Sequence, residues 1–179
     1  MIVACIVEAA VIVLPGCVMP GPHPDERRIA TEAINAQLVE WHAAADAGDF
    51  DAYFSRMTPN SAFLGTDRTE WWTRHEFEAF SRPYFDGVHA WTYEPIGTNV
   101  AFPSRHSTGL YEPTIAWIDE ILWNEKYGYC RGTGLLTRER GGPWLIHRYS
   151  LSLLVPNEKS AEVMDAIGPQ PAPGKPSAD

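Results

Sequence analysis

Two kinds of hydrophobic periodicity divide this chain, and the change between them constrains its fold more than any other feature. Ile34, Leu38, Trp41 and Ala45 recur at spacings of 4, 3 and 4, which places them on one face of a helix. That helix is predicted over residues 24–49, and Gly48 stops it. From Trp91 onward the pattern becomes that of strands. Helices followed by antiparallel strands predict an α+β domain and not a wound α/β one.

Two shorter helices and a strand separate these halves. The segment DFDAYFSRM predicts a helix with Asp49 as its N-cap, and its residues expected to be buried are Tyr53, Phe54 and Met57. A short strand, SAFLG, follows. The segment TRHEFEAFSRPYFDG predicts a third helix, which a capping box of Thr73 and Glu76 opens and Pro83 kinks or ends. Its buried side is expected to comprise Phe77, Phe80 and Tyr84.

Four strands are predicted in the second half of the chain. They are AWTYEPIGTNVAF, with an interruption near Pro95, then TIAWIDEILWN, YGYCRGTGLLTRE and PWLIHRYSLSLLV. Gly132 and Gly134 lie on the same face of the third of these strands. Glycines inside a strand often mark a bend or the close approach of another backbone. The sheet is therefore expected to be strongly curved.

The two ends of the chain read differently from its body. At 179 residues the chain is long enough for one well-buried domain, expected over 28–158, with a short helix over 159–167. Residues 18–27 form a Pro-rich tether, and the Pro-, Gly- and Ala-rich residues 168–179 are expected to be disordered.

Residues 1–17 resemble an export signal. Their apolar run is too short to span a bilayer and fits a secretory h-region, and its ending, LPGC, resembles a bacterial lipobox with Cys17 as the lipidated residue. Glu8 within the run, and the lack of Lys or Arg before it, argue against a signal. We expect a secreted or membrane-anchored lipoprotein of the bacterial envelope, with a cytoplasmic protein that has a loose N-terminal extension as the alternative.

Charge and motif content exclude several classes of function. The net charge of -9 argues against nucleic acid, whose phosphates require a basic surface. No phosphate loop, zinc motif or calcium loop is present, and His23, His75, His89 and His106 have no ligand spacing. We therefore expect neither a metal nor a cofactor. Cys130, alone in a predicted strand, is interpreted as a buried core thiol.

The order of segments resembles the nuclear transport factor two-like superfamily, and especially its SnoaL-like branch. The likeness lies in WHAAADAGDFDAYFS, SAFLGTDRTEWWTRHEFEAF, AWIDEIL, CRGTGLL and SLSLLVPN, and covers about residues 28–158. The resemblance implies a cone in which a curved antiparallel sheet wraps around a long N-terminal helix. It also implies a pocket at the open end and a homodimer across the sheet.

Three residues are candidates for acid–base catalysis: Asp119, His147 and Tyr149. Asp119 lies among apolar residues, and burial of a carboxyl raises its pKa toward the range a general acid or base needs. Strict alternation puts His147 and Tyr149 on one apolar face of their strand. Two simpler interpretations stay open: an ion pair of Asp119 with Arg131 or Arg148, and a hydrogen-bonded core role for His147.

The loop GTDRTEWW is expected to form the rim of the pocket. Trp71 and Trp72 are adjacent and cannot share one helical face, so one of them can cover the cavity. Asp67 either reaches the pocket or stabilises a turn through its own backbone. The resemblance places the base of ketosteroid isomerase near Gly65, where this chain has no carboxylate. The residues expected to line the pocket are Tyr53, Asp67, Trp71, Trp72 and Trp117.

Three functions are compatible with these residues. The first is binding of a small apolar or aromatic molecule in the cone. The second is an acid–base enzyme, such as an isomerase, a cyclase or a hydratase. The third is a dimerisation or scaffold module whose own aromatic side chains, 12% of the chain, fill the cavity. A fold by itself does not choose among them.

Overall fold

The computed structural model describes residues 24–85, 87, 89–103 and 114–169. Its helices are α1 (Pro24–Asp46), α2 (Phe50–Ser55), α3 (Arg74–Ser81) and α4 (Ser160–Ile167), with 3₁₀ turns η1 (Arg82–Tyr84) and η3 (Asn157–Lys159). Its strands are β1 (Met57–Leu64), β2 (Trp71–Thr73), β3 (Glu94–Ala101), β4 (Ile115–Asn124), β5 (Gly128–Thr137) and β6 (Leu145–Leu153). The α+β prediction is confirmed.

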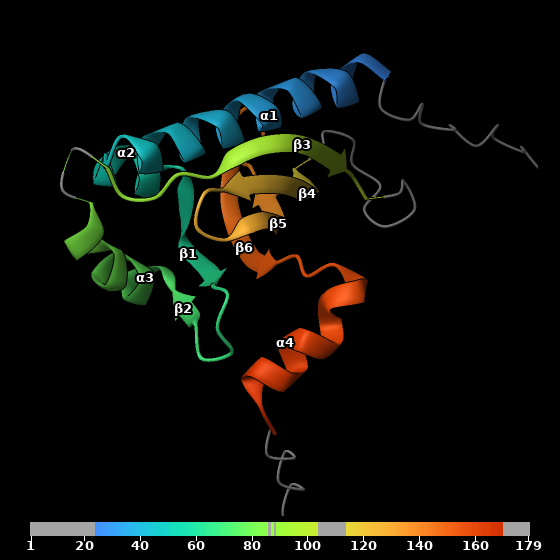
Figure 1. Cartoon of the computed structure of the whole chain (residues 1–179). Helices are drawn as coiled ribbons and strands as arrows, with labels where there is room; N and C mark the ends of the chain where they lie inside the picture. The colour runs from blue at the N-terminus through green and yellow to red at the C-terminus, as the bar shows by residue number, and fades with distance from the viewer. Residues whose placement is uncertain (1–23, 86, 88, 104–113, 170–179) are drawn as a thin grey trace, which may run out of the picture.

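One curved sheet carries all six strands, in the order β2-β1-β6-β5-β4-β3. Neighbouring strands are antiparallel except β1 and β6, which are parallel. A parallel pair needs a long connection, and here nearly the whole domain separates the two strands. Figure 1 shows α1 lying along the sheet, α2 and α3 toward one end of it, and α4 projecting from the body on the opposite side.

The long helix supplies the centre of the core. The predicted stripe of Ile34, Leu38, Trp41 and Ala45 is confirmed, with each side chain 0–2% exposed. Trp41 contacts the aromatic ring of Tyr149 from β6, with ring centroids 4.7 Å apart. Because α1 buries this stripe against the sheet, the helix and strands form one hydrophobic core.

The helix caps follow the sequence closely. The Asp49 carboxylate accepts a hydrogen bond from the Ala52 amide, and Thr73 and Glu76 form the predicted capping box. Phe77 is buried, but the prediction that Phe80 and Tyr84 are buried was wrong: both are exposed. Their rings lie 5.4 Å apart at the surface, with Phe80 in the last turn of α3 and Tyr84 at the end of η1, which begins just before Pro83.

Strand pairing is irregular between Met57 and Ala62 of β1, and also in β3 and β6. In β3 the ladder shifts between Pro95 and Gly97, which confirms the predicted interruption near Pro95. In β6, Leu135 pairs with Arg148 and Leu136 with Ile146, so His147 is an extra residue opposite β5. This bulge changes the alternation. Ile146 and Tyr149 therefore both face the core, although strict alternation had placed them on opposite faces.

The strand β2 was not predicted. Its residues pair with the end of β1, with Leu64 opposite Trp71 and Phe63 opposite Trp72, so the presumed loop is a short hairpin. At the N-terminus, α1 begins at Pro24, where the helix was predicted to begin, so it overlaps the last residues of the segment 18–27 expected to be a tether. Cys17 and most of the C-terminal tail lie outside the described residues. Within the described part, no helix is both long and apolar enough to cross a membrane.

Candidate functional site

An aromatic pocket opens between the β1–β2 hairpin, α3 and the segment that leads into β3. Its volume is about 200 Å³. Aromatic side chains dominate its lining, together with Leu151, Gly65, Thr66 and Glu70. The aromatic residues are Phe63, Trp72, Phe77, Phe80, Trp91, Tyr93 and Tyr127. Small-molecule sites commonly combine such an apolar wall with very few polar groups.

The wall of this pocket is an ordered stack. Phe77 packs on Phe63 with ring centroids 4.1 Å apart and planes inclined by 10°. Trp72 extends the stack to Phe77 at 5.6 Å and to Phe80 at 4.5 Å. Stacked contacts of this kind stabilise aromatic clusters beyond their buried area. Phe63 and Phe77 thus join the wall to the hydrophobic core.

Glu70 is the one charged side chain among the described residues that line the pocket. The hairpin positions it: the Gly65 amide donates to the Glu70 carbonyl at 2.9 Å, and the Asp67 amide donates to Glu70 Oε2 at 3.1 Å. A Cβ on Gly65 would collide with the Glu70 carboxylate and lie 2.9 Å from its Cβ. The missing side chain of Gly65 thus leaves the space that the Glu70 carboxylate fills.

Tyr93 supplies a hydroxyl to the same pocket. Burial, followed by the nearby Cys130, Tyr127 and Glu70, raises the pKa of Tyr93 well above its ordinary value. The hydroxyl consequently stays protonated at any physiological pH. The pocket thus contains a hydrogen-bond donor and acceptor at Tyr93 and a carboxylate at Glu70.

A second polar cluster is sealed inside the cone. The Tyr149 hydroxyl donates to Glu120 Oε2 at 2.9 Å, and His42 Nε2 lies 3.3 Å from the same oxygen. All three residues are buried, and Glu120 Oε1 has no hydrogen-bond partner. Burial first, and then the charge of Glu120 and its hydrogen bond, raise the pKa of Tyr149. The cluster joins α1 to β4 and β6.

Gly132 makes room for this cluster. A Cβ on Gly132 would collide with the Tyr149 hydroxyl and lie 2.5 Å from Tyr149 Cζ. The close approach expected at the strand glycines is therefore confirmed at Gly132, where the approaching group is the Tyr149 side chain.

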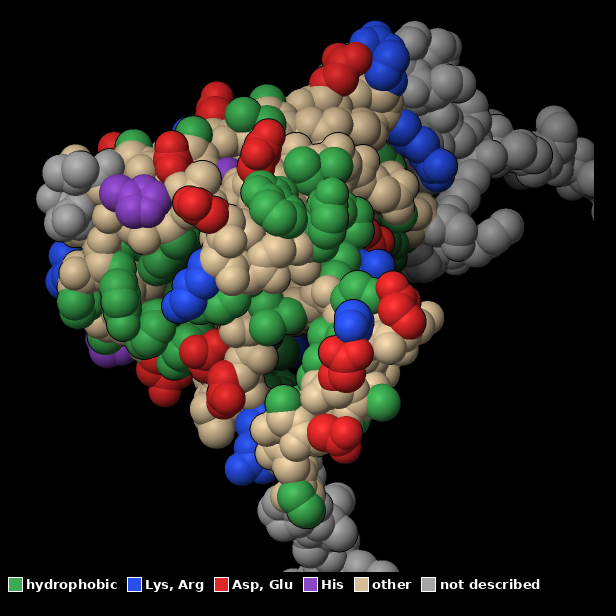
Figure 2. Space-filling view, viewed as in Figure 1, with side chains coloured by type: hydrophobic (Ala, Val, Ile, Leu, Met, Phe, Trp, Pro, Cys, Tyr) green, Lys and Arg blue, Asp and Glu red, His purple; other side chains and the backbone are tan. Residues whose placement is uncertain are grey.

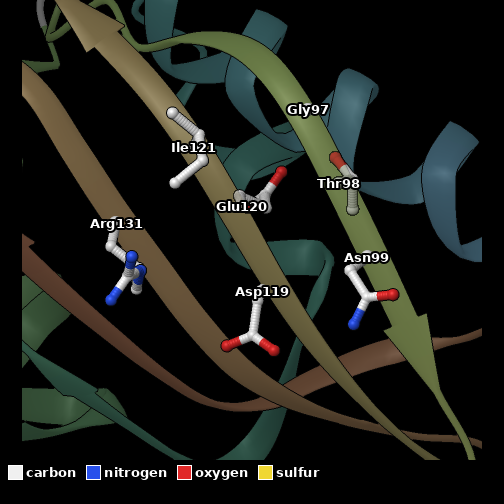
Figure 3. A pocket seen from close by; sticks show the side chains of 7 residues that line it. All are labelled: Gly97, Thr98, Asn99, Asp119, Glu120, Ile121 and Arg131. Atoms are coloured by element: carbon white, nitrogen blue, oxygen red, sulfur yellow. The ribbon is translucent and has the colours of Figure 1, made fainter.

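The three catalytic candidates do not converge. Asp119 lies on the outer face of the sheet, where its Oδ1 accepts from the Thr133 hydroxyl at 3.2 Å. Figure 3 shows Asp119 and Glu120 leaving β4 in different directions, with Asp119 in a surface groove that Asn99 and Arg131 also line. Alternation along β4 was read correctly, but the interior carboxylate is Glu120 and not Asp119.

His147 is also separated from Tyr149, because the bulge lies at its position. Its Nδ1 is 3.1 Å from the Thr58 hydroxyl, and the ring is half-buried. Of the three candidates only Tyr149 reaches the interior, where it contacts Glu120.

Of the five residues expected to line the aromatic pocket, Trp72 is the one that does so. Tyr53 is buried in the core, stacked on Trp41 at 4.9 Å. Trp71 is 66% exposed and carries the Arg148 guanidinium over its ring, while Trp117 lies on the outer face of the sheet. Asp67 accepts from the Thr69 amide at 2.8 Å, so it has the turn role given as the alternative.

Hydrogen bonds from Thr69 to its carboxylate lower the pKa of Asp67. An exposed carboxylate with a lowered pKa is ionised at neutral pH and is poorly suited to general acid–base work.

The sequence pattern did not identify three residues of these sites, namely Glu70, Tyr93 and Glu120. A signal existed for Glu120, which shares its face of β4 with Ala116, Ile118 and Leu122. The other face holds Trp117 and Trp123, so both faces are apolar, and pattern alone does not say which one is buried. Glu70 had no signal, because its place depends on the fold of the hairpin.

No group of three or more His, Cys, Asp or Glu side chains within the described residues could hold a metal ion.

The family model described as SnoaL-like domain matches residues 34–156, which is more than half of the chain. This chain belongs to the SnoaL-like family. The match thus runs from within α1 to just beyond the end of β6 and contains both the aromatic pocket and the buried cluster. No curated protein matches the sequence.

Solved structures share the fold of this SnoaL-like domain. An NTF2-like protein of unknown function from Pseudomonas putida has a TM-score of 0.56 at 14% identity, covering 74% of this chain and 92% of its own. A domain of unknown function with a cystatin-like fold from Nostoc punctiforme has a TM-score of 0.55 at 17% identity, covering 75% and 83%. A protein of unknown function from Pectobacterium atrosepticum has a TM-score of 0.56 at 14% identity, covering 75% and 100%. At these identities the likeness shows the fold alone.

Proposed function

We propose that this SnoaL-like domain binds a small apolar or aromatic molecule in the pocket that carries Glu70. The observation that supports the proposal is the open space of about 200 Å³ between ordered aromatic rings, with a single carboxylate beside it. A cavity filled by the protein's own side chains would instead favour the scaffold hypothesis. Here the rings of Phe63 and Phe77 pack against one another and leave the pocket open.

Native mass spectrometry of the purified domain tests the proposal. We expect a small molecule to co-purify with the wild-type protein. If the protein purifies without a ligand, we expect it to bind a small aromatic compound that is added to it. Thr66→Trp places a bulky ring at an exposed lining position and should abolish binding without disturbing the core. Glu139→Trp, on the exposed β5–β6 turn, is the matched control and should bind like wild type.

Equal binding by Thr66→Trp and the wild type would refute the proposal. The same conclusion follows if no co-purifying molecule and no aromatic compound associates with the wild-type domain.

An acid–base enzyme is the second candidate, and one observation favours it. The Glu70 carboxylate occupies the space where a side chain at Gly65 would lie, and the family resemblance places the base of ketosteroid isomerase near that position. A carboxylate among aromatic rings can take a proton from a ligand within hydrogen-bond reach. Exchange of an acidic C–H of a bound ketone with deuterated solvent, lost in Glu70→Gln, would support this function. Exchange that persists in the variant would contradict it.

We also propose that the outer face of the sheet pairs with a second copy of the chain. Large apolar side chains are exposed along it, namely Ile115, Trp117, Trp123 and Tyr129. Asp119 and Arg131 border one groove in the middle of this face (Figure 3). In a two-fold dimer each Asp119 can meet the Arg131 of the other copy, so the face is complementary to itself.

Light scattering with size-exclusion chromatography measures this association. Trp117→Glu should convert a dimer to a monomer, whereas Val39→Glu, at an exposed position on α1 and away from this face, should not. A monomeric wild-type domain at micromolar concentration would overturn the dimer.

From the sequence of residues 1–17 alone, we propose export and lipid attachment at Cys17. Fatty-acid labelling in the membrane fraction should disappear in Cys17→Ala, and labelling that persists in this variant would exclude the lipoprotein.

A further inference from the structure

We propose that the aromatic pocket selects a ligand with a cationic head group, an ammonium or quaternary ammonium, held between the Glu70 carboxylate and the surrounding rings. This inference rests on the proposed function, because it assumes that the same pocket binds a ligand. It adds the charge of that ligand, which the apolar lining alone does not specify.

The charge of the pocket comes from one residue. Glu70 is the one charged residue among the described lining residues; Arg68, on the same hairpin, lines a neighbouring groove and not this pocket. Its Oε2 accepts a single hydrogen bond, from the Asp67 amide, and its Oε1 has no partner among the described residues. A carboxylate that loses water to an uncharged ligand without gaining a partner is destabilised. A cationic ligand replaces the lost water with an ion pair.

The walls of the pocket are largely aromatic. Trp72, Phe77 and Trp91 stack with planes inclined by only 18° and 26° and form one continuous aromatic surface. The faces of aromatic rings, and of Trp most strongly, attract cations through their quadrupoles. Groups of such rings are the usual receptors for quaternary ammonium ions.

The rim of the pocket already holds an ammonium. Lys126 Nζ lies 4.8 Å from the centroid of the Tyr127 ring, and Tyr127 lines the pocket. The protein therefore uses one of these rings as a cation platform within its own fold. Lys126 does not line the pocket itself, so its charge leaves Glu70 available.

The electrostatic field of the whole protein also favours a cationic ligand. The chain carries a net charge of -9, and Figure 2 shows acidic side chains distributed over the face in view. A negative field of this kind raises the local concentration of small cations and lowers that of anions.

A matched pair of ligands tests the inference. Phenyltrimethylammonium and tert-butylbenzene have nearly the same shape and differ in charge. Isothermal titration calorimetry of the wild-type protein should give a dissociation constant about tenfold lower for the cation than for the hydrocarbon. Added salt should reduce this preference, because it screens the ion pair with Glu70.

Two variants separate Glu70 from the general field. Glu70→Gln keeps an acceptor for the Asp67 amide and should reduce the preference to about threefold, which the rings alone supply. Glu125→Gln makes the same change of charge in the β4–β5 turn, outside the pocket lining, and should leave the preference near its wild-type value. Thermal melts of both variants establish that the fold is retained.

The outcomes separate the two proposals. If both compounds bind equally to the wild type, the cation inference is overturned while ligand binding stands. If neither compound binds and no molecule co-purifies, the proposed function itself fails. If Glu125→Gln reduces the preference as much as Glu70→Gln does, the selectivity comes from net charge, and the assignment to Glu70 is overturned.

Discussion

Glu120→Ala and Asp119→Ala remove adjacent carboxylates from β4, and the structure predicts very different effects on the free energy of unfolding. The Glu120 side chain is 0% exposed, accepts from the Tyr149 hydroxyl at 2.9 Å and lies 3.3 Å from His42 Nε2. Truncation leaves the Tyr149 hydroxyl buried without its acceptor, at a cost of about 1–3 kcal/mol. The cavity adds about 2 kcal/mol.

The loss in Glu120→Ala is therefore about 3–5 kcal/mol, and the melting temperature should fall by about 10 °C or more. Asp119→Ala loses an exposed hydrogen bond to Thr133 and should cost about 0.5 kcal/mol or less. Urea denaturation followed by circular dichroism measures both values. Glu120→Gln retains an oxygen that accepts from Tyr149 and should cost less than Glu120→Ala.

If Asp119→Ala destabilises the domain as much as Glu120→Ala, the assignment of the interior carboxylate is refuted. A loss below about 1 kcal/mol in Glu120→Ala would refute the account of the buried cluster.

Further substitutions and a titration test other parts of the fold. Gly132→Ala forces a methyl group against Tyr149 and should lower the free energy of unfolding, measured by urea denaturation, by about 2–4 kcal/mol. Gly97→Ala, with open space at its Cβ, should lower it by about 0.5 kcal/mol or less. Similar losses of stability in both variants would contradict the packing of Tyr149 against Gly132. Burial raises the pKa of Tyr53 and Tyr149 well above 10.0. The unfolded chain thus releases these protons near pH 10 while the folded chain keeps them, and stability should fall above pH 10 by about 1.4 kcal/mol per pH unit for each tyrosine. Tyrosinate absorbance that appears for all seven tyrosines before unfolding would disprove this. Thr73→Ala removes the N-cap of α3 and should cost about 1 kcal/mol in the same denaturation assay, and no loss would mean that the capping box adds nothing.

Local rules were sufficient to predict much of this fold. The α1 stripe, the Asp49 cap and the capping box at Thr73 follow from spacing and from side chains that bond to neighbouring backbone. Interactions between distant segments were harder to predict. The pairing of β1 with β6 brings together residues far apart in the chain, and the extra residue at His147 is visible only once β5 is aligned with β6.

The site depends on those distant interactions. Asp119 and Glu120 are adjacent and both have apolar neighbours, so only the position of α1 decides which one is enclosed. Glu70 is a polar residue in a polar loop, and its importance comes from the space above Gly65 and from the rings that the chain brings around it. Trp72 was predicted from its adjacency to Trp71, because two neighbouring indoles must face different surroundings.

A crystallographic screen of small aromatic fragments tests the central proposal most directly. Fragments should occupy the space beside Glu70 that Trp72 and Trp91 also line, and a cationic fragment should place its ammonium within contact of the Glu70 carboxylate. Fragments that leave this pocket empty while they gather elsewhere, for example in the groove of Asp119 and Arg131, would contradict the account.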